Sequence, residues 1–180
     1  APAGSDSAPG TPQAPMKTIT AAIAKAGSST PPRAVLVRAG VYGEAVTMQA
    51  GVNVYGGFDE AWARNPAVTT EISAPSPAVR FEDIQTATVL DGFTLTSADA
   101  VIPGESSYAV VITGSRDIEL VDVQVRPGGG AAGLDGTDGV TGANGGVGAP
   151  GKPGCENSGG LCSSCSQPTG GNAGASVCGR

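Results

Sequence analysis

The sequence predicts an all-β solenoid, in which the chain coils into stacked rungs of short strands, followed by a glycine-rich segment. Between residues 34 and 125, runs of three to five aliphatic and β-branched residues alternate with Gly, Pro, Asp or Ser. The segment 88–95 aligns with 118–125, and 78–81 aligns with 109–112 at nearly the same spacing. A strand–turn–strand unit that recurs with loops between its copies is typical of a solenoid.

A short helix is expected over residues 18–27, before the first strand. Thr18 suits the N-cap position, and the helix has one apolar stripe, formed by Ile19, Ala22, Ile23 and Ala26. An amphipathic helix at this place would cover the open edge of the first rung.

The expected strands are 34–38, 45–48, 52–55, 78–81, 88–90, 93–96, 108–112, 118–120 and 123–125. A β-sandwich also has short strands and frequent turns, and it is the alternative architecture. The solenoid is favoured because the strands are shorter than hairpin strands usually are. Within residues 16–127 the one Asp-Gly or Asn-Gly hairpin signal, Asp91-Gly92, also lies inside the repeat.

The first part of the chain resembles a known family. Its lead Gly-Ser-Asp-Ser-Ala-Pro-Gly-Thr (4–11), then Pro15-Met-Lys-Thr-Ile19 and Val-Leu-Val-Arg-Ala-Gly-Val-Tyr-Gly-Glu (35–44), are similar to the opening of bacterial right-handed parallel β-helix (pectate-lyase-like) proteins. The resemblance covers about residues 4–126 and implies a short right-handed parallel β-helix with an N-terminal capping helix. It implies little about activity, because that superfamily contains lyases, hydrolases and adhesins.

Composition divides the chain into three parts. Residues 1–15 hold four of the 14 prolines and are expected to be a flexible N-terminal lead. Residues 16–127 carry nearly all the large apolar side chains and are expected to form the β-helix domain. Residues 128–180 hold 18 of the 29 glycines and all four cysteines, and are expected to be a glycine-triplet and disulfide-rich region.

From Gly130 to Gly154 a glycine occupies every third position, which matches the three-residue turn of a polyproline-II helix. Three structures remain open for this segment. A collagen-like triple helix would be weak, because only Pro150 and Pro153 fall within the triplets. Polyproline-II runs that fold back and pack on each other or on the β-helix are favoured. A flexible glycine-rich linker is the third.

The four cysteines are expected to form two disulfides, whose pairing the sequence leaves open: Cys155, Cys162, Cys165 and Cys178. Zinc is disfavoured because there is one C-x-x-C pair and no His in the sequence. Disulfides would place the protein outside the cytoplasm, in the extracellular space or on a bacterial cell surface.

No catalytic residues are predicted. The charged candidates are Arg80, Glu82, Asp83, Asp91, Arg116, Asp117, Glu119, Asp122 and Arg126, and their density is ordinary for a solvated surface. Asp135 and Asp138 lie one triplet apart and offer weak calcium ligands; no cofactor is otherwise expected. Trp62 is interpreted as an aromatic that plugs the side of the coil, rather than as a sugar platform. A Thr-rich face for ice or carbohydrate binding (Thr86, Thr88, Thr94, Thr96) is disfavoured.

The function expected from the sequence is therefore that of a non-catalytic structural or adhesive protein, self-associating into a homo-oligomer or fibre through its open end. The alternative is a β-helix protein that binds or cleaves extracellular polysaccharide. The net charge of −6 argues against nucleic acid as a partner. No transmembrane segment is expected, because no apolar run is long enough to cross a bilayer.

Overall fold

The computed structural model describes residues 1–154 and 168–175. The chain divides into two compact units, Ala1–Leu134 and Asp135–Arg180. The division lies somewhat after residue 127, the boundary expected from composition. The reason is that the first glycines still belong to unit 1: the amide of Ala100 donates to the carbonyl of Gly129 (2.9 Å).

Unit 1 is a coil of short strands in four rungs. The first rung contains β1 (Val35–Arg38), β2 (Gly40–Tyr42) and β3 (Val46–Thr47), and the second contains β4 (Val54–Phe58), β5 (Thr70–Ala74) and β6 (Val79–Glu82). The third contains β7 (Thr88–Asp91), β8 (Thr94–Ser97) and β9 (Val110–Thr113), and the last contains β10 (Ile118–Val121) and β11 (Gln124–Arg126).

Successive rungs stack into three sheets, ordered β1-β4-β7-β10, β2-β5-β8-β11 and β3-β6-β9. The strand pairings between rungs are parallel, and Val89 lies opposite Glu119, which confirms the alignment of 88–95 with 118–125. Val79 lies opposite Val110, which confirms the alignment of 78–81 with 109–112. Three parallel sheets, whose strands are connected by turns and by two longer loops at 59–69 and 98–109, confirm the all-β parallel β-helix.

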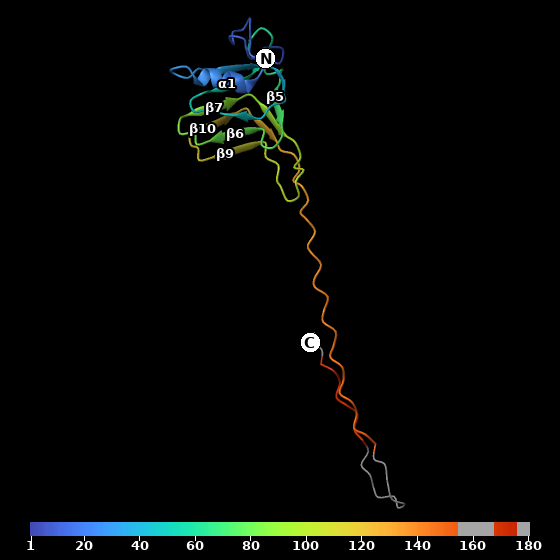
Figure 1. Ribbon diagram of the computed structural model, residues 1–180. Helices are drawn as coiled ribbons and strands as arrows, with labels where there is room; N and C mark the ends of the chain where they lie inside the picture. Colours follow the sequence, from blue (N-terminus) through green and yellow to red (C-terminus); the bar gives the residue numbers. More distant parts are fainter. Residues whose placement is uncertain (155–167, 176–180) are drawn as a thin grey trace, which may run out of the picture. The chain divides into compact units, whose positions relative to one another are not determined.

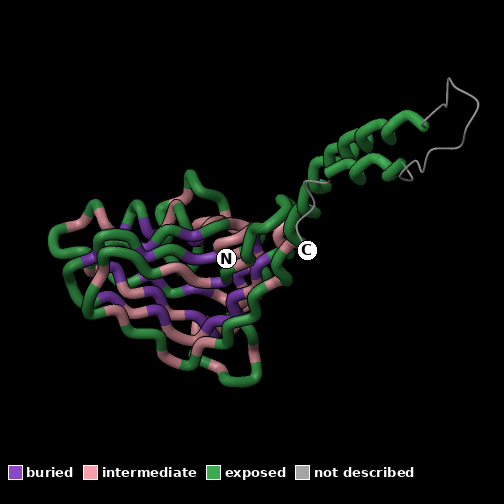
Figure 2. The backbone as a smooth tube through the Cα atoms, turned by 90° about the horizontal axis from the view of Figure 1, so that it is seen from below, coloured by how far each residue is buried: buried purple, intermediate pink, exposed green. Residues whose placement is uncertain are grey.

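The core lies inside the coil, and buried residues recur on the stacked strands of successive rungs (Figure 2). The apolar side chains of these residues pack into one cluster. Period-2 alternation points every second residue inward, so β5 buries Thr70, Ile72 and Ala74 while the residues between them face out. Phe81, Leu90 and Leu95 are among the largest fully buried side chains. Burial of these columns is what stabilises the stack.

The helix α1 (Ile19–Gly27) lies over one end of the coil, while β9 and β10 lie at the other (Figure 1). Thr18 is its N-cap, as predicted: the hydroxyl accepts from the amide of Ala21 at 3.2 Å. Ile19 and Ile23 are buried against the first rung. The helix therefore replaces a preceding rung on this side.

The N-terminal segment, expected to be a flexible lead, is hydrogen-bonded to the structure that follows it. The Asp6 carboxylate accepts from the amides of Lys17 (3.0 Å) and Thr18 (2.8 Å). The indole Nε1 of Trp62 donates to the carbonyl of Pro12 at 3.1 Å. These contacts join residues far apart in the sequence, so local composition did not reveal them.

Unit 2 contains two antiparallel runs of glycine triplets. The amides of Gly146, Ala149 and Lys152 donate to the carbonyls of Ala175, Asn172 and Thr169 at 2.7, 2.9 and 3.2 Å. From one bond to the next the donor lies three residues further along the chain and the acceptor lies three residues further back, which is one polyproline-II turn in each run. A Cβ at position 171 or 174 would collide with the opposite backbone, so the two runs need glycine there. This arrangement corresponds to the fold-back alternative.

Candidate functional site

The last rung exposes side chains that belong to the interior of the coil. In the first sheet a column runs through Val35, Val54 and Leu90, which are buried, and ends at Leu120, which is 39% exposed. A second column runs through Tyr42, Ile72 and Leu95 and ends at Val125, which is 49% exposed. In the third sheet fully buried Phe81 lies opposite Ile112 of β9, which is the terminal strand of that sheet, and Ile112 is 45% exposed. Within unit 1, β9, β10 and β11 therefore form one open apolar end, which we call the open last rung.

Each strand at this end, β9, β10 and β11, is the terminal strand of its sheet. Its outer backbone N–H and C=O groups have no further strand to pair with within the described residues. The rim carries both signs of charge, from Arg116, Asp117, Glu119, Asp122 and Arg126. An apolar centre with unpaired strand edges and a mixed-charge rim is the composition of a protein–protein contact.

The other charged candidates from the sequence are distributed over the surface of the coil. Arg80 pairs with Glu82 on the same strand at 3.0 Å, and both are about half exposed. Asp91 holds Arg64 through two hydrogen bonds of 2.7 and 3.0 Å, which raise the pKa of the Arg64 guanidinium. Arg64 was not among the predicted residues, because it lies in the loop between β4 and β5, outside the repeat. These charged residues therefore form separate ion pairs on the surface of the coil and do not converge on one site.

The opposite end of the coil is closed by polar anchors as well as by apolar packing. The Glu44 carboxylate accepts from the amides of Ile19 (2.7 Å) and Thr20 (3.0 Å) and from the Thr20 hydroxyl (2.6 Å). It thus satisfies helix N–H groups that lack intrahelical partners and faces the positive end of the helix dipole. The Tyr42 hydroxyl donates to the carbonyl of Arg38 at 2.9 Å, and burial raises the pKa of that phenol. The Gly-Val-Tyr-Gly-Glu motif at 40–44 therefore connects the first rung to the cap.

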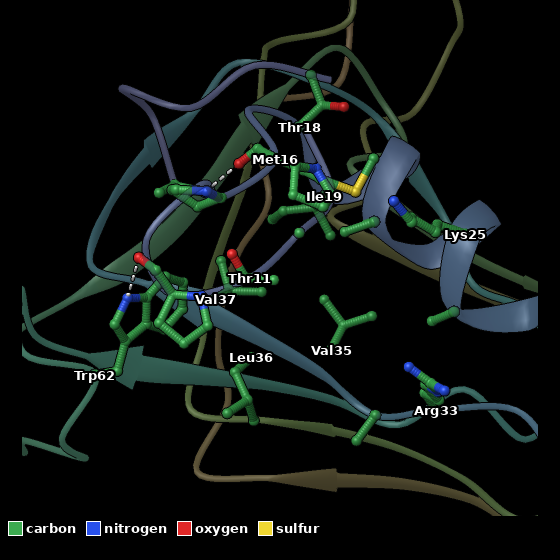
Figure 3. Close-up of a pocket in the computed structure, with 18 of the residues that line it drawn as sticks. Thr11, Met16, Thr18, Ile19, Lys25, Arg33, Val35, Leu36, Val37 and Trp62 are labelled. Carbon is green, nitrogen blue, oxygen red and sulfur yellow. Dashed lines mark hydrogen bonds between the residues drawn. The ribbon is translucent and has the colours of Figure 1, made fainter. Parts of the chain in front are cut away.

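A pocket of about 320 Å³ lies between the N-terminal segment, α1 and β1 (Figure 3). Its apolar lining includes Met16, Ile19, Val35, Val37 and several prolines of residues 9–15. Sequence reasoning missed this pocket because it treated residues 1–15 as flexible. The signal that was available is the spacing of Pro9, Pro12 and Pro15, which repeats every three residues, the polyproline-II period.

Within the described residues, the side chains that line this pocket include two cations and no carboxylate. Lys25 and Arg33 lie on one side of it in Figure 3 and Trp62 lies on the other. Trp62 is half-buried, and the Arg38 guanidinium lies 5.8 Å from the centre of its ring. Trp62 therefore contacts both the side of the coil, through Arg38, and the N-terminal segment, through Pro12.

Some predictions fall outside these sites. The four cysteines expected to form disulfides lie outside the described residues. Asp135 and Asp138 are exposed residues of unit 2, and within residues 1–154 and 168–175 no group of three or more acidic, His or Cys side chains is arranged to hold a metal ion. In the same residues, none of the helices is long and apolar enough to span a membrane.

Comparison with known proteins is informative at the family level. No significant match was found among curated proteins or among solved structures. Residues 2–119, which include the N-terminal segment, α1 and the first three rungs, match a family described as "Protein of unknown function (DUF1565)". The match begins before the helix, so the segment that packs against α1 lies within the matched residues. The match covers roughly two thirds of the chain, and the protein belongs to the DUF1565 family.

Proposed function

We propose that this protein is a non-catalytic structural or adhesive scaffold, located outside the cell, that joins to a second copy of itself through its open last rung. The observation that carries the proposal is the rise in exposure along all three columns. Leu90, Leu95 and Phe81 are fully buried, and the residues that continue their columns are 39–49% exposed. Water at this end contacts apolar surface that the preceding rungs bury.

A second copy fits this end because the end can complement itself. A two-fold axis across the coil reverses the strand direction of the partner, so β10 and β11 would meet strands that run antiparallel to them. Their outer N–H and C=O groups could then pair. The charges of the rim also favour a second copy as the partner. Each copy carries positive and negative side chains at this end, so opposite charges of two copies can pair. These side chains are Arg116, Asp117, Glu119, Asp122 and Arg126.

The covered first end favours a closed dimer over the fibre that the sequence suggested. A fibre needs two different surfaces that contact each other repeatedly. Here α1 packs on β1 and β3, so the first rung is not free to accept the last rung of another copy. A contact of last rung with last rung uses one surface twice and ends at two copies.

The mass of the protein in solution tests this proposal. Light scattering during size-exclusion chromatography should give twice the chain mass of 17.5 kDa. Val125→Lys should give a monomer, because it places a charge in the contact. Val41→Lys is the matched control: Val41 is an exposed Val on β2, at the covered end of the same sheet, and its variant should stay dimeric.

Circular dichroism must show that Val125→Lys keeps the strand signal of the parent protein. A monomeric parent at high micromolar concentration, or a folded Val125→Lys dimer, contradicts the contact. Filaments in electron micrographs contradict closure at two copies. Turnover of acidic glycans in a reducing-end assay contradicts the non-catalytic scaffold and favours the polysaccharide alternative.

The location outside the cell rests on the cysteines, all four of which lie between positions 155 and 178. If the protein is purified without reductant and then denatured, it should consume no thiol reagent, because it has no free thiols. After reduction it should consume four equivalents of the reagent, one for each cysteine. Free thiols in the unreduced protein contradict this location.

A further inference from the structure

We propose that the pocket between the N-terminal segment, α1 and β1 binds a small amphipathic anion: an unbranched apolar chain that ends in a carboxylate. This site is separate from the open last rung. It lies within the residues that match the family, and neither the scaffold role nor the dimer contact uses it.

The walls of the pocket suit an apolar chain. Ile19, Ala22 and Ala26 face it from α1, and Val35 and Val37 face it from β1. Met16 adds an adaptable side chain from the N-terminal segment. Its volume, about 320 Å³, falls at the small end of the range of roughly 300–1,000 Å³ that ligand sites occupy. This favours one short aliphatic chain over a large ring system or a folded peptide.

The charges select an anion. Lys25 and Arg33 line the pocket, and no described Asp or Glu does so, although the chain as a whole has a net charge of −6. Neither cation forms an ion pair with a carboxylate in the part of the chain that the structure describes. The Lys25 ammonium has one protein acceptor there, the carbonyl of Ala8 at 3.5 Å. Both heads therefore keep donors for a ligand.

The arrangement also fixes the direction of the ligand. The two cations lie on one side of the pocket and Trp62 on the other, with Val35 and Val37 between them (Figure 3). A carboxylate at Lys25 and Arg33 would direct its chain along β1 toward the indole. A neutral chain could fill the same walls, but it would gain nothing from the two cations.

Fluorescence of Trp62, the single tryptophan of the chain, reports binding directly. Titration with decanoate at low salt and below its micelle concentration should give a saturable change. Decanol has the same chain without the charge and should bind about tenfold more weakly. Decylamine has the opposite charge and should give no saturable change. High salt should lower the affinity for decanoate and leave the affinity for decanol unchanged.

Variants locate the anion. Lys25→Gln and Arg33→Gln should each weaken decanoate binding about threefold and leave decanol binding unchanged. Lys17→Gln is the matched control, since Lys17 is a cation that lies just before α1 and does not line the pocket. Ala22→Phe should abolish binding of both compounds, because it fills the pocket. Thermal unfolding of each variant checks that α1 remains docked.

Three results would overturn the proposal: no saturable response to decanoate, equal affinity for decanoate and decanol, or binding that Lys25→Gln, Arg33→Gln and Ala22→Phe all leave unchanged. Because the readout is fluorescence of a monomer or a dimer alike, failure here is distinct from failure of the dimer contact.

Discussion

The two ends of the coil face the same physical problem and differ in how it is met. At the first rung the inward side chain of Val35 is buried, and α1 lies over it. At the last rung Leu120, in the same column, is 39% exposed. A stack of rungs has no intrinsic end, so each end needs a cover. This chain provides one cover from its own sequence, and we propose that a second copy provides the other.

The first cover is specified in detail. Thr18 caps α1 from within its own segment, whereas Glu44 reaches the helix from the turn after β2. Asp6 fixes the backbone just before the helix. The helix, the first rung and the N-terminal segment thus depend on one another, and no comparable element of unit 1 covers the last rung.

The largest expected effect compares two leucines of one column. Leu90→Ala should lower the free energy of unfolding by about 2–5 kcal/mol, because the side chain is fully buried between rungs. Leu120→Ala should cost about 1 kcal/mol in dilute, monomeric protein, because part of that side chain already contacts water. Urea unfolding measures both. Equal costs in the monomer would mean that the last rung is not open.

A smaller effect is expected at the covered end. Glu44→Gln should lower the free energy of unfolding by about 1 kcal/mol, because the carboxylate accepts from two helix amides and opposes the helix dipole. Glu82→Gln is the control, since that carboxylate pairs with Arg80 on the exposed face of β6. Its cost should stay within about 0.5 kcal/mol. If Glu44→Gln is as stable as Glu82→Gln, the Glu44 carboxylate does not contribute to the stability of the cap.

The smallest effect concerns pH. The backbone amide of Thr18 is the main cause that lowers the pKa of Asp6 below its ordinary value. The ionised carboxylate therefore contributes stability above the unfolded-state pKa, and this contribution is lost as the pH falls through the folded-state pKa. Carbon-detected NMR should find the Asp6 midpoint below the value of about 3.9 for a free Asp. Asp6→Asn should remove this part of the acid dependence of Tm. A midpoint at or above the ordinary value would contradict the contact with Thr18.

Much of the fold could be predicted from the sequence because the core repeats. The alignment of 88–95 with 118–125 contains the register itself, since Val89 and Glu119 are partners. The stripe of α1 likewise follows from spacing. By contrast, β2 and β5 were missed. Residues 70–74 read Thr-Glu-Ile-Ser-Ala, a weak strand former, and the segment becomes a strand because it pairs on both sides with β2 and β8.

The candidate sites could be predicted only in part. An open last rung follows from any solenoid whose capping signal occurs once, and the sequence suggested it. The pocket depends on contacts such as the one between Trp62 and Pro12, which are far apart in the sequence. Neither residue type nor spacing identifies such a pair. The prolines at 9, 12 and 15 look like a linker until the helix and the first strand are placed beside them.

The in-register repeat that relates the third rung to the last has a consequence for engineering. Residues 85–114 include β7, β8, β9 and the loops between them, and the chain enters the next rung in the same register. Tandem duplication of that stretch would lengthen the coil by one interstrand spacing, about 4.8 Å, without altering either terminus of the stack. The length of the coil could thus be set by the number of copies of residues 85–114 that the chain contains.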